Sequence, residues 1–355
     1  MQNDSEHGSA KIRELHGLTR IPETLKQSQH KRNTHLIQWA PKLTERGHAP
    51  MELSFTKLNG AGNDFVFVDD FSSEIELTTS QVSWLCDRHF GIGADGVILV
   101  RPSVRPECAA YMHYINSDGT LAQMCGNGVR CFAKFLVDRG YVQASDGSFV
   151  ADTLAGPKPI SFTVDDEDKM LQATVDMGHP ILEPSEVPVN AKANATSPAG
   201  AAYAREIEID SPWGPFAFTC VSMGNPHAIT FINDFNTLPK DLFISEERSL
   251  ETLDLEKIGA FYESNPVFPE KANIEFAHIG EAGIEMRVYE RGCGETLACG
   301  TGACATCVAA ALTERTGREN DLILRGGVLH ILWTEDDHVM MTGPAAEAFE
   351  GTVVL

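Results

Sequence analysis

Two Cys-Gly-x-Gly motifs stand 174 residues apart in this chain. The first, "MCGNG", contains Cys125, and the second, "ACGTG", contains Cys299. Each motif directly precedes a stretch with apolar residues at helical spacing, so each cysteine is predicted at the start of a helix. Unpaired N–H groups and a partial positive charge at such a start attract a carboxylate, and they favour the thiolate form of cysteine.

Two thiols on opposite sides of one carbon atom could invert its configuration. One thiolate would remove the α-proton of a bound amino acid while the opposite thiol donates a proton from the other face. Because the α-proton is very weakly acidic, backbone N–H donors in a dry cavity would have to stabilise the carbanion. The paired motifs therefore indicate stereoinversion at an amino-acid α-carbon without a cofactor.

Short strands and a few helices must position these motifs. The helix at 301–317 is apolar nearly all round, which predicts burial on every side. Thr79 or Ser80 is the expected N-cap of the first helix, and the connection 183–204, with three prolines, is expected on the surface. Strands are predicted at 65–70, 96–100, 171–178, 216–224, 272–279, 283–290, 327–333 and 338–343, and helices at 77–91, 127–140, 255–264 and 301–317. This pattern indicates an α+β protein.

The two parts of the chain also resemble each other. "GAGNDF" at 60–65 is matched by "SMGNPH" at 222–227, 162 residues later, and the two Cys-Gly motifs repeat with an offset of 174. Offsets of this size are far longer than the period of a solenoid repeat. They indicate a weak internal duplication of one domain.

Residues 51–355 resemble the diaminopimelate epimerase family. The resemblance rests on six motifs in the family's order: "NGAGNDF", "RHFGIGADG", "NSDGTLAQMCGNGVRCFAKF", "MGNPHAI", "ANIEFAHI" and "YERGCGETLACGTGACA". It implies two pseudo-symmetric domains, each a β-sheet or barrel-like layer wrapped around a central helix. The halves are expected at 51–170 and 171–343, with a last strand at 344–355 returning to the first half.

The resemblance also implies an activity and its residues. The activity is cofactor-independent epimerisation of LL-2,6-diaminopimelate to the meso form, in lysine and peptidoglycan-precursor synthesis, by an enzyme that often forms a homodimer. Cys125 and Cys299 would be catalytic, with His227 and Glu290 as auxiliary groups near the thiols. The implied substrate-binding residues are Asn63, Asn116, Gly126, Asn127, Asn225, Asn273, Glu290, Arg291, Gly300 and Thr301.

Two positions depart from the family pattern. Some members have a glutamine where this chain has Gly96, and that glutamine contacts the substrate, which a glycine cannot do. Cys293 stands where a small residue such as alanine is common, and it is predicted to pack as a small residue.

Three alternatives can be weighed on the same residues. Cys299, Cys304 and Cys307 fit the C-x4-C-x2-C spacing of plant-type iron–sulfur proteins. Core packing is favoured for Cys304, Cys307 and Cys131, because they fall within helical runs, and no metal site is expected.

A racemase of the same fold acting on another amino acid is the nearest alternative. Proline racemases typically have His where this chain has Asn127, and phenazine-type isomerases lack the paired cysteines.

Composition limits the kinds of binding partner and the cellular compartment that can be expected. A formal net charge of −22 argues against a nucleic-acid partner, and no apolar run approaches the length of a membrane span. Nine cysteines without a secretory signal indicate a reducing compartment, the cytoplasm or, if residues 1–50 are a transit peptide, a plastid. Residues 1–50 are polar and aperiodic, and are predicted to be a disordered or extra N-terminal extension.

Overall fold

The computed structural model of the protein describes residues 51–355, and the extension predicted at 1–50 lies outside these described residues. The helices are α1 (Thr79–Cys86), α2 (Gly126–Asp138), α3 (Leu255–Glu263) and α4 (Gly300–Leu312), with single 3-10 turns at Ala144–Asp146, Phe235–Thr237 and Lys240–Leu242. The strands are β1 (Glu52–Gly60), β2 (Asn63–Asp69), β3 (Gly96–Arg101), β4 (Ala110–Asn116), β5 (Ser148–Asp152), β6 (Lys158–Val164), β7 (Met170–Asp176), β8 (Ala195–Thr196), β9 (Ala202–Tyr203), β10 (Ile207–Ile209), β11 (Phe216–Ser222), β12 (Pro226–Phe231), β13 (Asn273–Ile279), β14 (Ile284–Glu290), β15 (Gly294–Thr296), β16 (Glu319–Leu324), β17 (Gly327–Trp333), β18 (Val339–Pro344) and β19 (Ala346–Val354).

The two halves repeat one order of strand pairings. In the first half, β1 is antiparallel to β2, β2 parallel to β3, β3 antiparallel to β4, β4 parallel to β5, and β5, β6 and β7 follow as antiparallel neighbours. In the second half, β11, β12, β13, β14, β16, β17 and β18 repeat this order of antiparallel and parallel pairings. The predicted fold class, α+β with two pseudo-symmetric domains, is confirmed.

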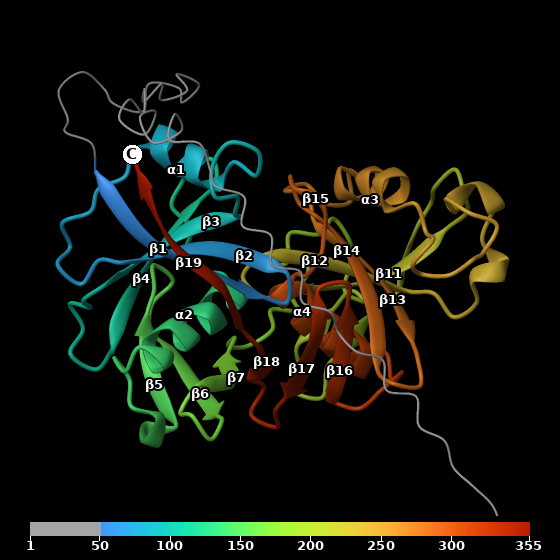
Figure 1. Ribbon diagram of the computed structural model, residues 1–355. Helices are drawn as coiled ribbons and strands as arrows, with labels where there is room; N and C mark the ends of the chain where they lie inside the picture. Colours follow the sequence, from blue (N-terminus) through green and yellow to red (C-terminus); the bar gives the residue numbers. More distant parts are fainter. Residues whose placement is uncertain (1–50) are drawn as a thin grey trace, which may run out of the picture. The chain divides into compact units, whose positions relative to one another are not determined.

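Helices α2 and α4 occupy equivalent places in this repeat. Each lies in the connection between the fourth strand of its half and a parallel neighbour of that strand, with the short β15 preceding α4, so each packs on the sheet that it crosses. Figure 1 shows α2 among the strands of the first half and α4 among those of the second. Eleven of the thirteen residues of α4 are buried, as its apolar composition predicts. No helix in residues 51–355 is both long and apolar enough to cross a membrane.

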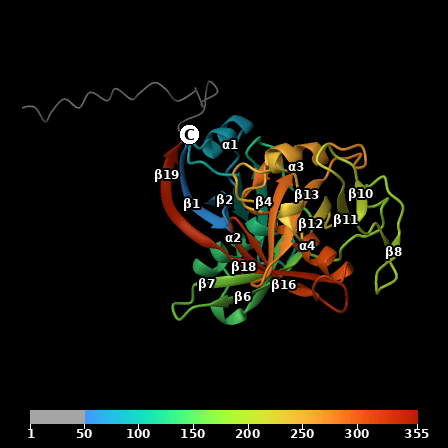
Figure 2. The same ribbon diagram turned by 90° about the vertical axis from the view of Figure 1, so that its right-hand side faces the viewer.

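Strand pairing also joins the halves. The last strand of each repeat, β7 and β18, pair with each other in antiparallel register, with Val175 opposite Met341. One hydrophobic cluster accordingly contains side chains of both α2 and α4. The final strand, β19, lies beside β1, as both views show (Figures 1 and 2). The domain boundaries expected at 170 and 343 stay a prediction.

Two local predictions were wrong. The N-cap of α1 is Thr78, because its hydroxyl accepts the Gln81 N–H while the Gln81 side chain accepts the Thr78 N–H, and this capping box leaves no such role for Thr79 or Ser80. The connection 183–204 is not wholly on the surface. Its valines at 187 and 189 are buried, and its buried Tyr203 donates a hydrogen bond to the carbonyl at the end of α4.

Candidate active site

Each motif cysteine occupies the N-cap position of a helix. Cys125 precedes α2 with φ −139° and Cys299 precedes α4 with φ −119°, so both have extended backbone at the point where the helix begins. No side-chain oxygen caps either helix. The first-turn N–H groups of both helices are therefore available to a bound anion.

The two helix starts meet at one methionine. A Cβ added at Gly126 would lie 2.6 Å from Met341 Cε, and one added at Gly300 would lie 3.1 Å from Met341 Sδ. In addition, Asn127 Nδ2 donates to the carbonyl oxygen of Ala298, at 3.4 Å, directly before the second cysteine. The glycine after each cysteine therefore leaves room for the Met341 side chain, which packs against both helix starts.

The Cys125 thiol is held by an oriented amide. The thiol donates to Asn63 Oδ1 at 3.4 Å, and Asn127 Nδ2 donates to the same oxygen at 3.3 Å. The amide nitrogen of Asn63 donates to Asp95, whose carboxylate also accepts from Arg88 at 2.8 Å. Asp95 thus fixes which end of the Asn63 amide faces the thiol. Sequence reasoning missed Asp95, although an acidic residue within a glycine-rich loop was a visible signal.

Cys299 lies beside the partly buried carboxyl group of Glu290. Its sulfur is 3.4 Å from Thr301 Oγ1, and Thr296 Oγ1 donates to Glu290 Oε1. Burial raises the pKa of Glu290, while the hydrogen bonds from Thr296 and from the Cys299 thiol act in the opposite direction. The negative charge of Glu290 in turn raises the pKa of both Cys125 and Cys299. The negative charge of one carboxyl group therefore disfavours the thiolate form of both cysteines.

Burial is the main cause of the raised thiol pKa values. It raises the pKa of Cys125 and raises that of Cys299 well above its ordinary value. The N–H groups of Gly128 and Asn127 lower the pKa of Cys125, and the Thr301 hydroxyl lowers that of Cys299. Thiolate formation in this site therefore depends on the donors at the helix starts.

His227 and Glu275 form a buried pair under the first turn of α4. His227 Nδ1 lies 2.6 Å from Glu275 Oε1, and His227 Nε2 lies 3.1 Å from Asn225 Oδ1. A Cβ at Gly302 would be only 2.7 Å from Glu275 Oε1, which places the carboxylate against the helix. Sequence reasoning missed Glu275, and the signal was a single acidic residue within the apolar strand "ANIEFAHI".

Two expected binding residues hold the turn after β14. Asn273 is buried, and its side chain donates to the carbonyl of Pro226 at 2.8 Å and accepts the Arg291 N–H at 2.9 Å. The guanidinium of Arg291 is exposed and donates to the carbonyl of Glu270. Their contacts with a substrate stay a prediction.

Gly96 and Asn116 lie opposite each other on β3 and β4. The Asn116 side chain donates to Thr120 Oγ1 at 3.1 Å, within its own turn. A Cβ at Gly96 would lie 2.5 Å from Tyr114 Cε2 and 2.6 Å from the carbonyl oxygen of Ile115. This chain therefore has no space for the glutamine that some family members carry at this position.

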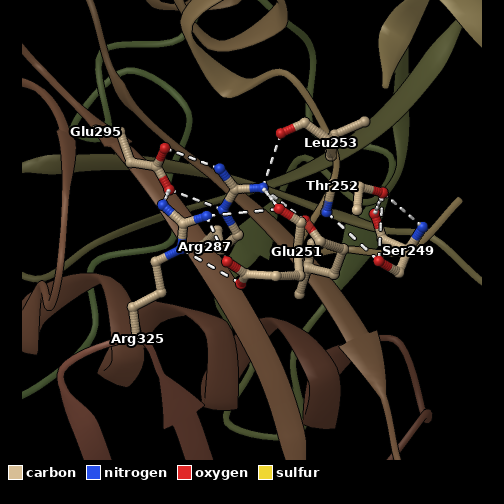
Figure 3. A network of polar contacts seen from close by, with 8 residues as sticks. Ser249, Glu251, Thr252, Leu253, Arg287, Glu295 and Arg325 are labelled. Atoms are coloured by element: carbon tan, nitrogen blue, oxygen red, sulfur yellow. Dashed lines mark hydrogen bonds and ion pairs between the residues drawn. The ribbon is translucent and has the colours of Figure 1, made fainter. Parts of the chain in front are cut away.

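An ion-pair network, shown in Figure 3, holds the hairpin of β14 and β15. Glu290 is the last residue of β14. Arg287 on β14 donates twice to Glu295 on β15, at 2.7 and 2.8 Å, and its third nitrogen donates to the carbonyls of Leu250, Glu251 and Leu253. Arg325 pairs with Glu251 and Glu295 from the turn after β16. Because Arg287 is buried, its bonds lock the hairpin to the neighbouring loop.

The remaining cysteines differ in exposure. Cys304 and Cys307 in α4 and Cys131 in α2 are buried in the hydrophobic core, as predicted. The packing predicted for Cys293 is wrong: it is exposed in the turn between β14 and β15, where the glycines on either side of it, Gly292 and Gly294, both have positive φ. Across residues 51–355, no group of three or more His, Cys, Asp or Glu side chains is arranged to hold a metal ion.

The family model and a curated relative indicate the same family. The family model for diaminopimelate epimerase matches residues 55–183 and 219–347. A diaminopimelate epimerase of Methanococcus maripaludis (strain C6) is 42% identical over 303 residues, covering 85% of this chain and 99% of the relative. Two solved structures are similar in fold, each with a TM-score of 0.59. They are a PhzF-family phenazine biosynthesis protein of Bacillus anthracis, 15% identical over 86% of this chain and 100% of that one, and a hydroxyproline epimerase of Agrobacterium vitis, 14% identical over 87% and 93%.

Proposed function

Because this chain belongs to the diaminopimelate epimerase family, we propose that it interconverts LL- and meso-2,6-diaminopimelate with Cys125 and Cys299 as the two proton-transfer groups. It is an isomerase of lysine and peptidoglycan-precursor synthesis. One observation carries the proposed roles: two helix starts, each preceded by a cysteine, meet at Met341, and the Glu290 carboxyl group acts on both thiols.

The α-carboxylate of the substrate binds between the helix starts. In this proposal the carboxylate accepts hydrogen bonds from the N–H groups of Gly126 and Asn127 at one start, and of Gly300 and Thr301 at the other, where no side-chain oxygen caps either helix. Met341 forms an apolar wall against both glycines and keeps water from this end of the site. The distal amino-acid end is bound by Asn63, Asn116, Asn225 and Asn273, and Glu290 and Arg291 hold polar groups of the substrate near Cys299.

Proton transfer then takes place across the α-carbon. In one direction the Cys299 thiolate removes the α-proton, and the Cys125 thiol donates its proton to the opposite face of the carbanion. The helix N–H groups stabilise the enolate-like charge that develops on the carboxylate. The reverse reaction exchanges the two roles. Glu290 accepts the thiol proton of Cys299 when the Cys299 thiolate forms. The pair of His227 and Glu275 supports the first turn of α4.

The pH dependence of the activity should follow the ionisation of Glu290. Its pKa is raised by burial, so below that pKa the carboxyl group is neutral and cannot accept a thiol proton. Activity should therefore rise with pH through a value above the ordinary glutamate pKa. Glu290→Gln should lower kcat/KM by about 10²-fold or more and remove this acidic limb, as measured by pH–rate profiles.

A matched control lies on the same strand. Glu285 is exposed on β14, and Glu285→Gln should keep both the rate and the acidic limb. An acidic limb that persists unchanged in Glu290→Gln would rule Glu290 out as the proton acceptor.

The proposed function is tested by product analysis. Reduced protein is incubated with LL-2,6-diaminopimelate, and the stereoisomers are separated by chiral chromatography. Formation of the meso isomer is the expected result. If another amino acid is inverted and diaminopimelate is not, the two-thiol chemistry remains and the substrate is corrected. If no amino acid tested is inverted, the proposal fails.

The setting of the enzyme follows from the same chemistry. Nine free thiols and a thiolate mechanism support a reducing compartment, for which we propose the cytoplasm. Diaminopimelate is the proposed small-molecule partner. The homodimer that the family resemblance implies stays a prediction, which sedimentation analysis would test.

A further inference from the structure

Arg130 on α2 is a buried cation without an acidic partner in the described part of the chain. Its exposure is 0%, and within residues 51–355 its guanidinium forms no ion pair with a carboxylate. It donates instead to four uncharged acceptors: Asn127 Oδ1 at 2.9 Å, Pro344 O at 3.3 Å, Gly126 O at 3.4 Å and Met341 Sδ at 3.6 Å. A buried charge left uncompensated is strongly unfavourable unless an anion forms nearby.

A short path leads from this cation to the first catalytic thiol. The Gly126 carbonyl that accepts from Arg130 belongs to the same peptide group as the Asn127 N–H, and that N–H favours the thiolate of Cys125. A cation on the carbonyl oxygen polarises the peptide and strengthens its N–H as a donor. Arg130 also holds Asn127 Oδ1, which turns Nδ2 toward Asn63 and toward the residue before the second cysteine.

The second helix has no such cation at the equivalent position. Arg130 stands five residues after Cys125, whereas the residue five positions after Cys299 is Cys304. The two side chains come from helices in equivalent places of the repeat, and they lie close enough to interact electrostatically. The pseudo-symmetry of the fold is therefore broken by one charge beside one of the two thiols.

We propose that Arg130 is a positioning residue that makes Cys125 the more readily ionised of the two thiols, by polarising the Gly126–Asn127 peptide and orienting the Asn127 side chain. At a pH between the ionisation midpoints of the two thiols, the free enzyme then holds a negative charge at Cys125 and a proton at Cys299. The proton lost by Cys125 goes to solvent. This distribution determines which epimer the resting enzyme deprotonates first. The inference rests on the proposed two-thiol function.

Other titratable groups also face this region. They come from four elements: Glu290 on β14, Tyr114 on β4, Cys131 on α2 and Cys304 on α4. Burial raises the pKa of Tyr114 and of both core thiols, so these three groups stay neutral. The charge of Glu290 opposes thiolate formation at Cys125. Arg130 is the cation that offsets it.

Thiol alkylation tests the inference without using turnover. Iodoacetamide labelling of each cysteine is quantified by peptide mass spectrometry over a range of pH, and midpoints are compared because absolute rates also depend on access. In the unmodified protein, the midpoint of Cys125 should lie below that of Cys299. In Arg130→Gln, the Cys125 midpoint should rise by about one pH unit, a tenfold change in ionisation constant, and Arg130→Lys should stay close to the original.

Two controls accompany this measurement. The exposed Cys293 is an internal reference whose midpoint should not change in any variant. Lys134→Gln removes a cation one turn further along α2, where the ammonium pairs with Asp138, and it should leave Cys125 unchanged.

Equal midpoints for the two motif cysteines in the unmodified protein would overturn the inference, and so would an unchanged Cys125 midpoint in folded Arg130→Gln. The first comparison needs no variant, so it decides the question even if Arg130→Gln does not fold. Because labelling requires no turnover, its result is independent of whether diaminopimelate proves to be the substrate.

Discussion

Replacing either Cys125 or Cys299 by serine is expected to abolish epimerisation and leave the fold intact. A serine hydroxyl is close in size to the thiol, but it is a far weaker acid and cannot exchange protons with an α-carbon at the required rate. The loss of one acid–base group is expected to lower kcat by about 10²–10⁴-fold. Turnover of LL-2,6-diaminopimelate measures the first effect, and circular dichroism with thermal unfolding measures the second.

Cys293→Ser is the matched control for these variants. Cys293 is exposed in the turn after β14 and has no assigned role, so its replacement should leave turnover unchanged. Substantial turnover in either Cys125→Ser or Cys299→Ser would contradict the two-thiol mechanism, because each thiol is required on its own face of the α-carbon.

The second large effect concerns stability. Arg287→Met should lower the free energy of unfolding by about 3–5 kcal/mol, because it breaks a buried pair with Glu295 and removes donors from the carbonyls of the loop 250–253. Chemical denaturation measures this change. Since the same hairpin carries Glu290, the variant should also lose activity at denaturant concentrations below its unfolding midpoint.

Arg325→Met serves as the comparison. Arg325 pairs with Glu251 and Glu295 but is 30% exposed, so its removal should change the unfolding free energy by about 1 kcal/mol or less. Equal losses for the two arginine variants would show that burial does not determine the strength of this network.

The sequence predicted the parts of the site that depend on local structure. Glycine spacing and helical periodicity placed Cys125 and Cys299 at two helix starts, and the repeated motifs indicated the duplication. Both features follow from backbone preferences within a few residues. Their convergence on Met341 could not be predicted in this way, because it depends on the long-range pairing of β7 with β18.

Long-range contacts also explain what sequence reasoning missed. The role of Asp95 depends on the direction in which the Asn63 amide points. Arg130 is unusual because its buried guanidinium has no carboxylate partner within residues 51–355. Neither property is visible in a motif. Two of the errors have the same origin: Val187 was expected in a surface connection and Cys293 was expected to pack, but whether such a side chain points inward or outward is determined by tertiary packing.

The most direct test of the two-thiol account is the isotope content of both epimers early in the reaction. Reduced protein is incubated with LL-2,6-diaminopimelate in D2O, and substrate and product are recovered at low conversion. The account predicts deuterium at the inverted carbon of the meso product and protium in the recovered LL substrate, because one thiol removes the proton and the other donates a deuteron. Protium retained at the inverted carbon, or equal deuterium in both epimers, would contradict it.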